Sequence, residues 1–565
     1  MRVMKRIIII LLSLLPLLAV SQSHDVSFAK PLGIDLVLSA NFGELRPDHF
    51  HSGVDFKTRG SIGYKVYAVE EGYVSRISVS PWGYGKALYI DHPSGYTSVY
   101  AHLDAMEGDI AEALKRMQYE RQSYAIDTLL APGLLPVTKG MYIAVSGNSG
   151  SSGGPHLHFE IRHTATESPI DPLPFYRQYI KDNTAPEPRT IALYHHDAVA
   201  HGDVLPKSVS QLQHNGGNNY VATTPFEAWG RVSLGIKAYD RMTGTTNIYG
   251  VRHVRCLVDD SLLYESVIDS ITFAETRYIN SLIDYHELRS NKGSTIMRTA
   301  ILPGNKLSTL YGDAVTDGTM VIDQQRKYKG VYELTDLYGN RSVVKFVIQG
   351  KPAEPTTKEP DGVLFEYLHD NEYATEDMNI YLPAGALYDD FYFSHKAVNQ
   401  SGYYSAVHRV HNRTVPLHQW GELAIKITVD TLPDEKYYMV YIDNDKKSPV
   451  EGRYHAGWIT ARVRKLGQYA IAADVTAPTI TPVKPEEWGS SQKVEFKITD
   501  KESGIATYRG EIDGEFCLFE YDAKRNTITC HLDDTPFVKG ISHELTLVVT
   551  DCCGNSSRAK HKIKW

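Results

Sequence analysis

The sequence predicts a mainly β protein built from an antiparallel-sheet domain with one inserted helix, followed by about three β-sandwich, immunoglobulin-like modules. Its 565 residues exceed what one compact core holds, since domains average roughly 100 to 200 residues. Most of the chain consists of short runs rich in Val, Ile, Tyr and Thr, separated by Gly, Asn, Asp and Pro, which is typical of antiparallel sheets. The 37 Tyr against 16 Phe also favour half-exposed strands, where a ring packs and its hydroxyl stays hydrated.

Composition excludes several classes of protein. A hydrophobic content of 42% with 22% charged residues is ordinary for a globular chain and argues against a disordered or polytopic membrane protein. The net charge is -8, and no block of Lys and Arg stands out. Since nucleic-acid binding needs a concentrated basic surface, we expect no nucleic-acid partner.

The first 21 residues have the features of a signal peptide. Three basic residues precede an apolar run from Ile7 to Val20, and small residues surround Val20. The run is shorter than the roughly 20 residues that span a bilayer, and no cysteine follows it to carry a lipid. We therefore expect an exported protein of the periplasm or the extracellular cell envelope, with no stable membrane insertion after residues 1–21 are removed.

Repeated short sequence motifs mark the predicted domain boundaries. Thr184-Ala185-Pro186 and Thr476-Ala477-Pro478 each open a β-rich stretch, as suits the first residue of an edge strand. Asp336–Asn340 and Asp551–Asn555 are similar Gly-Asn turns, and Lys351–Pro360 has the composition of a linker. The predicted divisions are residues 24–183, 184–350, 361–475 and 476–565, and the last three have sizes suited to β-sandwich modules.

One segment carries helical periodicity. Between residues 107 and 125, Ile110, Ala113, Leu114 and Met117 recur at helix spacing, which predicts one amphipathic helix. It lies in an insert between His102 and the strand expected at 137–146. The insert is either a surface excursion or a wall beside a groove.

The five cysteines all lie late in the chain and are too few for a disulfide scaffold. Cys517 and Cys530 flank a polar turn almost symmetrically. They are either a cross-strand bridge or two small buried hydrophobic residues.

The residues that suggest chemistry lie in the first division. His51 and Asp55 are four residues apart with Gly53 between them, which allows a sharp backbone course. His156 and His158 are two apart on a predicted strand, so both imidazoles share one face. His102 ends another predicted strand. Zinc held by three protein ligands keeps a fourth position open, as catalytic sites do, and this division contains no cysteine.

The motifs His51-x-Gly53-x-Asp55, Tyr100-Ala101-His102-Leu103 and Gly147–Glu160, with the turn Gly83-Tyr84-Gly85 and the strand Ala87–His92 between them, together resemble the M23 family of zinc metallopeptidases. This is the lysostaphin and LytM type of peptidoglycan endopeptidase. The resemblance covers about residues 40 to 176, roughly a quarter of the chain. It implies that His51, Asp55 and His158 bind Zn²⁺ and that His102 and His156 are the catalytic histidines.

Several alternatives stay open beside this assignment. The sequence does not say which of His102 and His156 is the base. Asp91 or Glu160 is a candidate to orient an imidazole. His49 competes with His51 as a ligand, although the family spacing favours His51, and His92 fits a turn histidine with a satisfied ring.

The resemblance implies a secreted zinc-dependent endopeptidase that hydrolyses the peptide crosslinks of bacterial peptidoglycan through a zinc-activated water. An alternative is a catalytically silent or autoinhibited wall-binding or activator protein with the same fold. A third is a peptidase that acts on exported proteins. The β modules after the first division are expected to bind wall, to bind an envelope protein partner or to cover the groove.

Overall fold

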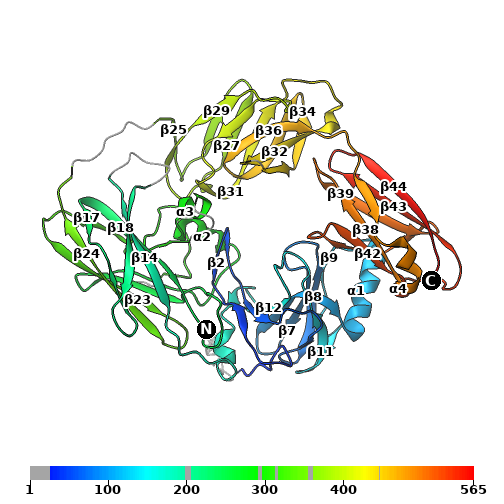
Figure 1. Cartoon of the computed structure of the whole chain (residues 1–565), viewed down its shortest axis with the longest axis horizontal. Coiled ribbons are helices and arrows are strands. Elements are labelled where there is room, and N and C mark those ends of the chain that lie inside the picture. The colour runs from blue at the N-terminus through cyan, green and yellow to red at the C-terminus, as the bar shows by residue number, and fades with distance from the viewer. Residues whose placement is uncertain (1–25, 198–204, 291–294, 312–315, 354–360, 445) are drawn as a thin grey trace, which may run out of the picture.

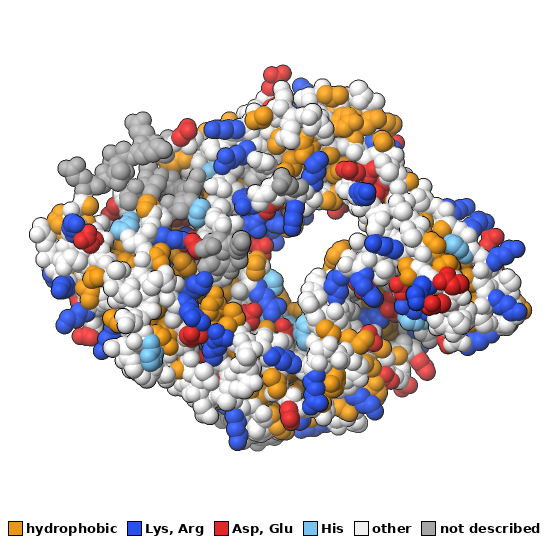
Figure 2. All heavy atoms as spheres, viewed as in Figure 1, with side chains coloured by type: hydrophobic (Ala, Val, Ile, Leu, Met, Phe, Trp, Pro, Cys, Tyr) orange, Lys and Arg blue, Asp and Glu red, His pale blue; other side chains and the backbone are white. Residues whose placement is uncertain are grey.

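The computed structural model describes residues 26–197, 205–290, 295–311, 316–353, 361–444 and 446–565. The predicted signal peptide at residues 1–21 and most of the predicted linker lie outside these ranges. Four β units follow one another in chain order around a central opening (Figure 1), and the opening is also visible in the space-filling view (Figure 2).

The amino-terminal sheet has eleven strands, and all its pairings are antiparallel. Its main path is β1-β4-β12-β8-β7-β6-β10, and a separate hairpin, β2 with β3, precedes β4. The strands are β1 (Leu38–Ala40), β2 (Leu45–Arg46), β3 (His49–Phe50), β4 (Val54–Lys57), β5 (Lys65–Tyr67), β6 (Gly72–Val79), β7 (Lys86–Asp91), β8 (Tyr96–Met106), β9 (Ile126–Leu129), β10 (Pro136–Val137), β11 (Tyr142–Ser146), β12 (His156–His163) and β13 (Pro169–Ile170).

The predicted amphipathic helix is confirmed as α1 (Gly108–Arg121), and its buried face includes Ile110, Ala113, Leu114 and Met117. The insert after it adds β9 and β10 to the edge strand β6. None of the helices in the described ranges has both the length and the apolarity needed to cross a bilayer. The remaining helices are short: η1 (Leu173–Tyr176), η2 (Thr276–Tyr278), α2 (Ile279–Leu282), α3 (Tyr285–Ser290), η3 (Asp434–Lys436), η4 (Pro485–Glu487), α4 (Trp488–Ser491) and η5 (Leu532–Asp534).

The strands of the second unit form one connected eleven-stranded sheet rather than two separate sheets. β15 pairs with β14 through its first half and with β16 through its second half, so it joins two sheets. The pairings of β24 with β16 and β17 are parallel. The strands are β14 (Glu187–His195), β15 (Lys207–His214), β16 (Asn219–Ala222), β17 (Phe226–Ala228), β18 (Gly230–Tyr239), β19 (His253–Val258), β20 (Ser261–Val267), β21 (Met297–Arg298), β22 (Thr319–Ile322), β23 (Lys327–Thr335) and β24 (Arg341–Gly350).

The first two units share one hydrophobic cluster, which runs from Phe28 to Ile348 and reaches Tyr388. Polar contacts join them as well. Asn41 Nδ2 donates to the Gly250 carbonyl at 2.8 Å, and the Phe50 amide donates to Thr276 Oγ1 at 3.0 Å. The second unit therefore contacts the segment around the β2–β3 hairpin and helps to fix its position.

The last two units each enclose their own core between two sheets. In the third unit the strands are β25 (Val363–Phe365), β26 (Asn371–Ala374), β27 (Met378–Leu382), β28 (Phe391–Phe393), β29 (His395–Val398), β30 (Val407–Val410), β31 (Pro416–Lys426), β32 (Tyr437–Asp443), β33 (Lys446–Val450), β34 (Gly452–His455), β35 (Trp458–Lys465) and β36 (Gly467–Ala473). The C-terminal module, as we name the fourth unit, contains β37 (Thr479–Pro482), β38 (Lys493–Thr499), β39 (Ile505–Ile512), β40 (Glu515–Cys517), β41 (Glu520–Asp522), β42 (Thr527–His531), β43 (His543–Asp551) and β44 (Ser556–Ile563).

Cys517 and Cys530 lie in different sheets of the C-terminal module and face each other across its core. Their Sγ atoms are 2.9 Å apart, and both residues are buried. They are therefore not neighbours on paired strands, because β40 pairs with β39 while β42 pairs with β38 and β41. A bridge between them stays a prediction.

The C-terminal module closes the ring by touching the amino-terminal sheet. Lys86 Nζ forms an ion pair with Glu520 Oε2 at 2.9 Å. Lys524 Nζ donates to the carbonyls of Asn148 and Ser152. The insert helix contributes too, since the Tyr119 ring meets the Phe516 ring edge to face at 5.7 Å. These contacts reach the loop that leads into β12.

Candidate metal centre and active site

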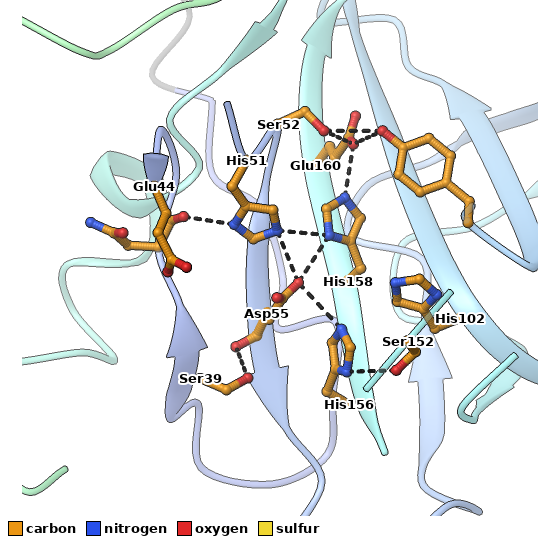
Figure 3. A network of polar contacts seen from close by, with 12 residues as sticks. Ser39, Glu44, His51, Ser52, Asp55, His102, Ser152, His156, His158 and Glu160 are labelled. Atoms are coloured by element: carbon orange, nitrogen blue, oxygen red, sulfur yellow. Dashed lines mark hydrogen bonds and ion pairs between the residues drawn. The ribbon is translucent and has the colours of Figure 1, made fainter. Parts of the chain in front are cut away.

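Three side chains that the sequence proposed as ligands converge on one point. His51 Nε2 lies 3.1 Å from Asp55 Oδ1 and 3.0 Å from His158 Nδ1, and His158 Nδ1 lies 2.9 Å from the same carboxylate oxygen. Figure 3 shows the two imidazoles and the carboxylate directed toward one another. All three are nearly fully buried, and they form one of the groups able to hold a metal ion.

Strand pairing creates this convergence. β4 and β12 run antiparallel with Asp55 directly opposite His158, so the two side chains share a face of the sheet. Leu157 and Phe159 alternate with the histidines and are fully buried behind them, as predicted.

Gly53 is needed for close approach rather than for a left-handed turn. A β-carbon placed on it would lie 2.3 Å from the Phe159 carbonyl oxygen. Any larger residue would push the loop that carries His51 away from β12. The chain also bends at Gly53, as predicted, so this glycine combines a bend with tight packing of the loop against β12.

The outer nitrogen of each ligand histidine is already used. His51 Nδ1 donates to the Asn41 carbonyl at 2.7 Å, and His158 Nε2 donates to Glu160 Oε1 at 2.8 Å. Since a neutral imidazole carries one N–H, the inward atoms, His51 Nε2 and His158 Nδ1, keep their lone pairs. This is the tautomer arrangement that metal-binding histidines take.

Glu160 is the hub of the outer contacts. It is fully buried and accepts hydrogen bonds from Ser52 Oγ at 2.7 Å and Tyr84 Oη at 2.6 Å. Arg162 Nε also donates to it at 2.6 Å. Burial would raise the pKa of Glu160, but the Arg162 charge and His158 hold it well below its usual range. The carboxylate is thus ionised and fixed.

The electrostatics favour a cation between the ligands. Burial opposes the charge of Asp55, yet the neighbouring imidazoles, His51 foremost, hold its pKa well below the usual value. Burial likewise opposes the charge of His158, but Asp55 and Glu160 raise its pKa to about 9. Two imidazole nitrogens and one carboxylate oxygen are a donor set that suits Zn²⁺ and leaves a coordination position open.

His102 and His156 lie beside the three ligands but are partly exposed. Their ring centroids are 4.8 Å apart. His102 Nδ1 donates to the Ser149 carbonyl at 2.9 Å, and His156 Nδ1 donates to the Gly154 carbonyl at 2.8 Å. The Nε2 atom of each ring is thus left to accept a proton. His156 Nε2 lies 3.4 Å from Asp55 Oδ1.

His102 has an unusual backbone conformation, with φ of 57°. The register of β8 against β7 shifts between the pairs Lys86↔Leu103 and Leu88↔Tyr100, so β8 carries one extra residue there. A bulge of this kind re-aims a side chain, and a non-glycine residue held at positive φ stores strain. Burial, and after it the nearby His158 and His156, lower the pKa of His102 to about 3.

The other histidines lie apart from this group. His49 is exposed, and its Nδ1 contacts the Pro47 carbonyl. His92 is buried with both nitrogens engaged, by the Glu71 carbonyl and Ser98 Oγ, as predicted for a satisfied ring. Asp91 bonds Ser75 and Thr97 rather than an imidazole, so Glu160 is the orienting carboxylate of the two candidates.

Sequence reasoning missed three residues around the ligands. Asn41 offers its backbone carbonyl to His51, and no motif marks it. Arg46 Nη2 lies 3.2 Å from Asp55 Oδ2, and it reaches the site from the β2–β3 hairpin. Tyr84 was noted only as part of a turn, yet its hydroxyl bonds Glu160.

Comparison with known proteins matches two parts of the chain. Residues 49–118 match Peptidase family M23, and residues 362–474 match the Zu5-like domain. The first match includes His51, Asp55 and His102 and ends within α1. The fold and the donor set therefore belong to the class of metallopeptidase domains.

Two curated proteins and one solved structure are similar to part of this chain. An uncharacterized metalloprotease of Haemophilus influenzae is 32% identical over 118 residues, which are 21% of this chain and 19% of that protein. The peptidoglycan DD-endopeptidase ShyB of Vibrio cholerae is 32% identical over 123 residues, 22% of each chain. A crystal structure of a zinc containing peptidase from Vibrio cholerae is 29% identical, covering 24% of this chain and 36% of that one, with a TM-score of 0.18.

The chain spans about a fifth of the length of the curated relatives it matches. Its amino-terminal sheet contains an M23 peptidase family domain, and a Zu5-like domain follows later in the chain.

Proposed function

We propose that the protein is a zinc-dependent endopeptidase that hydrolyses the peptide crosslinks of bacterial peptidoglycan. The observation that carries the proposal is the buried set of His51, Asp55 and His158, bordered by two partly exposed histidines. Membership of the M23 family and the likeness to a peptidoglycan DD-endopeptidase support the substrate class.

In this proposal His51 Nε2, Asp55 Oδ1 and His158 Nδ1 hold Zn²⁺. When bound, zinc supplies a Lewis acid that polarises the scissile carbonyl and makes water a nucleophile near neutral pH. Asn41 and Glu160 fix the ring orientations from outside. Their hydrogen bonds keep protons away from the two inward nitrogens.

His102 and His156 are the proposed catalytic histidines. Each donates its Nδ1 proton to a backbone carbonyl, so each Nε2 is free to take the proton of the attacking water and pass it to the leaving amine. Once protonated, such an imidazole also stabilises the oxyanion that forms on the substrate. No acyl-enzyme is needed.

We further propose that the protein acts outside the cytoplasm, in the periplasm or the extracellular envelope, where crosslinks are found. The β units after the first are assigned as a β-sandwich module at residues 184–350, a β-rich module at 361–475, where the Zu5-like domain matches, and an immunoglobulin-like module at 476–565. The separate cores of the last two units support this division. In this proposal an envelope protein partner binds the surfaces of these modules.

Purified peptidoglycan tests the activity. The full chain without residues 1–21 should convert crosslinked muropeptides to uncrosslinked ones, and a chelator should stop the reaction until zinc is restored. Mass analysis of the products identifies the bond that is cut. Unchanged crosslinked species with zinc-loaded, folded protein would overturn the assignment as an active hydrolase.

A second candidate, an autoinhibited state, is favoured by the contact that closes the ring. Lys524 Nζ donates to the carbonyls of Asn148 and Ser152. The Ser149 carbonyl, which lies between them in the chain, accepts from His102 Nδ1. Ser152 Oγ lies 3.2 Å from His156 Nδ1. In this second proposal the loop at residues 148–152 is the rim of the active site. The C-terminal module contacts this rim and limits the access of a crosslinked peptidoglycan strand.

A further inference from the structure

Two clusters of three aspartates occupy equivalent places in the second unit and the C-terminal module. One consists of Asp182, Asp240 and Asp336, and the other of Asp474, Asp500 and Asp551. Within each cluster one oxygen from every carboxylate lies within 4.8 Å of the others. Each cluster joins the segment before a Thr-Ala-Pro sequence, the end of a strand and a Gly-Asn turn.

The hydrogen bonds repeat as well. Asn340 Nδ2 donates to Asp336 Oδ2 at 2.8 Å and to the Asp182 carbonyl at 3.2 Å. In the C-terminal module, Asn555 Nδ2 donates to Asp551 Oδ2 at 2.8 Å and to the Asp474 carbonyl at 3.1 Å. The two clusters thus share the asparagine bonds that tie the turn to the segment before the Thr-Ala-Pro sequence.

They differ at one buried oxygen. Asp182 is 5% exposed. Its Oδ1 accepts from the Thr184 and Thr243 amides, at 3.0 and 2.9 Å, and from Thr243 Oγ1 at 3.1 Å, and Oδ2 takes part in none of these bonds. That Oδ2 is buried and meets no hydrogen-bond donor among the described residues. The equivalent Asp474 Oδ2 accepts from Ser503 Oγ at 2.7 Å.

An orphaned carboxylate oxygen in a buried cluster is costly. None of the three carboxylates pairs with a Lys, Arg or His within the part of the chain that the structure describes. The cluster lies where the sheet of the second unit meets the connection from the amino-terminal sheet.

We propose that Asp182, Asp240 and Asp336 form a calcium site, distinct from the zinc centre, that ties the amino-terminal sheet to the second unit. Carboxylate oxygens suit a hard cation, and Ca²⁺ accepts irregular oxygen cages more readily than Mg²⁺, which demands near-ideal octahedral geometry. Asp474, Asp500 and Asp551 form the matched cluster that binds no ion, because Ser503 already satisfies its oxygen.

The site lies at a junction, so its effect is on stability and on the placing of the first unit. Asp182 ends the connection from the amino-terminal sheet, and Tyr338, in the same turn as Asp336, donates its hydroxyl to the Ile180 carbonyl at 2.9 Å. An ion here would hold that connection against the ends of β18 and β23. Binding to the folded state alone raises the thermal midpoint by mass action.

The test uses the full zinc-loaded chain after passage over a calcium-chelating resin, with calcium chloride as the probe. We expect one calcium per chain by equilibrium dialysis, with affinity in the range of about 0.1 to 1 mM typical of extracellular modules, and a rise in the thermal midpoint. Asp240→Asn should abolish both. Asparagine can still accept from the Arg241 amide, the one hydrogen bond that Asp240 Oδ1 makes, so this variant should fold.

Asp500→Asn, in the matched cluster, should bind calcium as the parent does. So should Asp269→Asn, which removes an exposed carboxylate paired with Arg252. No calcium bound by the parent chain would overturn the site whatever the variants do. Calcium retained by Asp240→Asn, or lost equally in Asp500→Asn, would overturn the assignment to this cluster, and an equal response to magnesium would overturn calcium as the ion.

Discussion

Glu160 Oε1 accepts the Nε2 proton of His158 at 2.8 Å, from the side opposite the three converging ligand atoms. This contact fixes which nitrogen of His158 faces the metal centre. It also links that centre to Arg162, because the other oxygen of Glu160 accepts from Arg162 Nε.

Glu160→Gln should weaken zinc binding by about 10- to 100-fold, the usual cost of losing an outer partner of a metal ligand. The protein should also lose stability, by about 3 to 5 kcal/mol, because Arg162 is left buried without its counter-charge. Competition with a chromophoric chelator measures the affinity of the folded fraction.

Glu107→Gln is the control for that substitution, since Glu107 accepts from the Tyr142 hydroxyl at 2.7 Å but touches no imidazole. It should leave the zinc affinity unchanged. An unaltered affinity in Glu160→Gln would mean that the glutamate serves packing alone.

His51→Ala and Asp55→Ala should each lose both bound zinc and activity, because each removes one of three ligand atoms. His156→Ala should keep zinc and lose about 10²- to 10⁴-fold in rate, the usual contribution of a general acid–base group. Metal analysis and muropeptide release separate the two outcomes. His163→Ala, on the exposed end of the same strand, is the control. Loss of zinc from His156→Ala would exchange the roles of His156 and His158.

Removing the contacts that close the ring tests autoinhibition. Lys524→Ala combined with Glu520→Ala should raise the rate of muropeptide release by about two- to tenfold. The gain is modest because the two changes remove one partly buried ion pair and two hydrogen bonds to backbone carbonyls, and a hydrogen bond contributes only about 0.5 to 1.5 kcal/mol. Lys560→Ala, which breaks an exposed pair with Glu544 elsewhere on the C-terminal module, should change nothing. A slower or unchanged double variant would show that the contact supports the rim rather than restricting it.

His418 should make stability depend on pH. It stacks on Tyr278 with ring centroids 4.0 Å apart. Burial, and then the charges of Arg464 and Arg277, lower its pKa to about 4 from 6.5. Above pH 6.5 neither state is protonated, so the stabilisation is complete. Between about 6.5 and 4 the unfolded chain takes up the proton first, so the free energy of unfolding falls as the pH falls.

Urea unfolding at a series of pH values measures that slope. His418→Gln should reduce this slope without abolishing it, because other buried histidines contribute the rest. His369→Gln, at an exposed position paired with Glu366, should leave the slope unchanged. An unchanged slope in His418→Gln would assign the acid sensitivity elsewhere.

Spacing predicted that His156 and His158 lie on one face of a strand, because residues two apart on a strand share a face, whereas the metal-ligand roles stay a prediction. His156 and His158 needed only that rule. The helix at residues 108–121 followed from four apolar positions. These features are local, so the sequence carries them directly.

The rest depends on contacts between distant segments. Asn41 contributes a backbone atom, which no side-chain pattern reveals. The positive φ of His102 comes from a bulge against β7, and the continuous path of the second unit depends on β15 bending between two sheets. Lys524 meets the loop at residues 148–152 only because the two intervening units bring the C-terminal module back to the first unit.

The closing contact also sets an order on folding. Lys86 and Glu520 are 434 positions apart in the chain, so their meeting carries a large loop-closure cost that is repaid only after the intervening units have formed. The strands that carry the histidines precede residues 476–565 in the chain, so they are synthesised before them. The contact that closes the ring can therefore form only after the C-terminal module has been added.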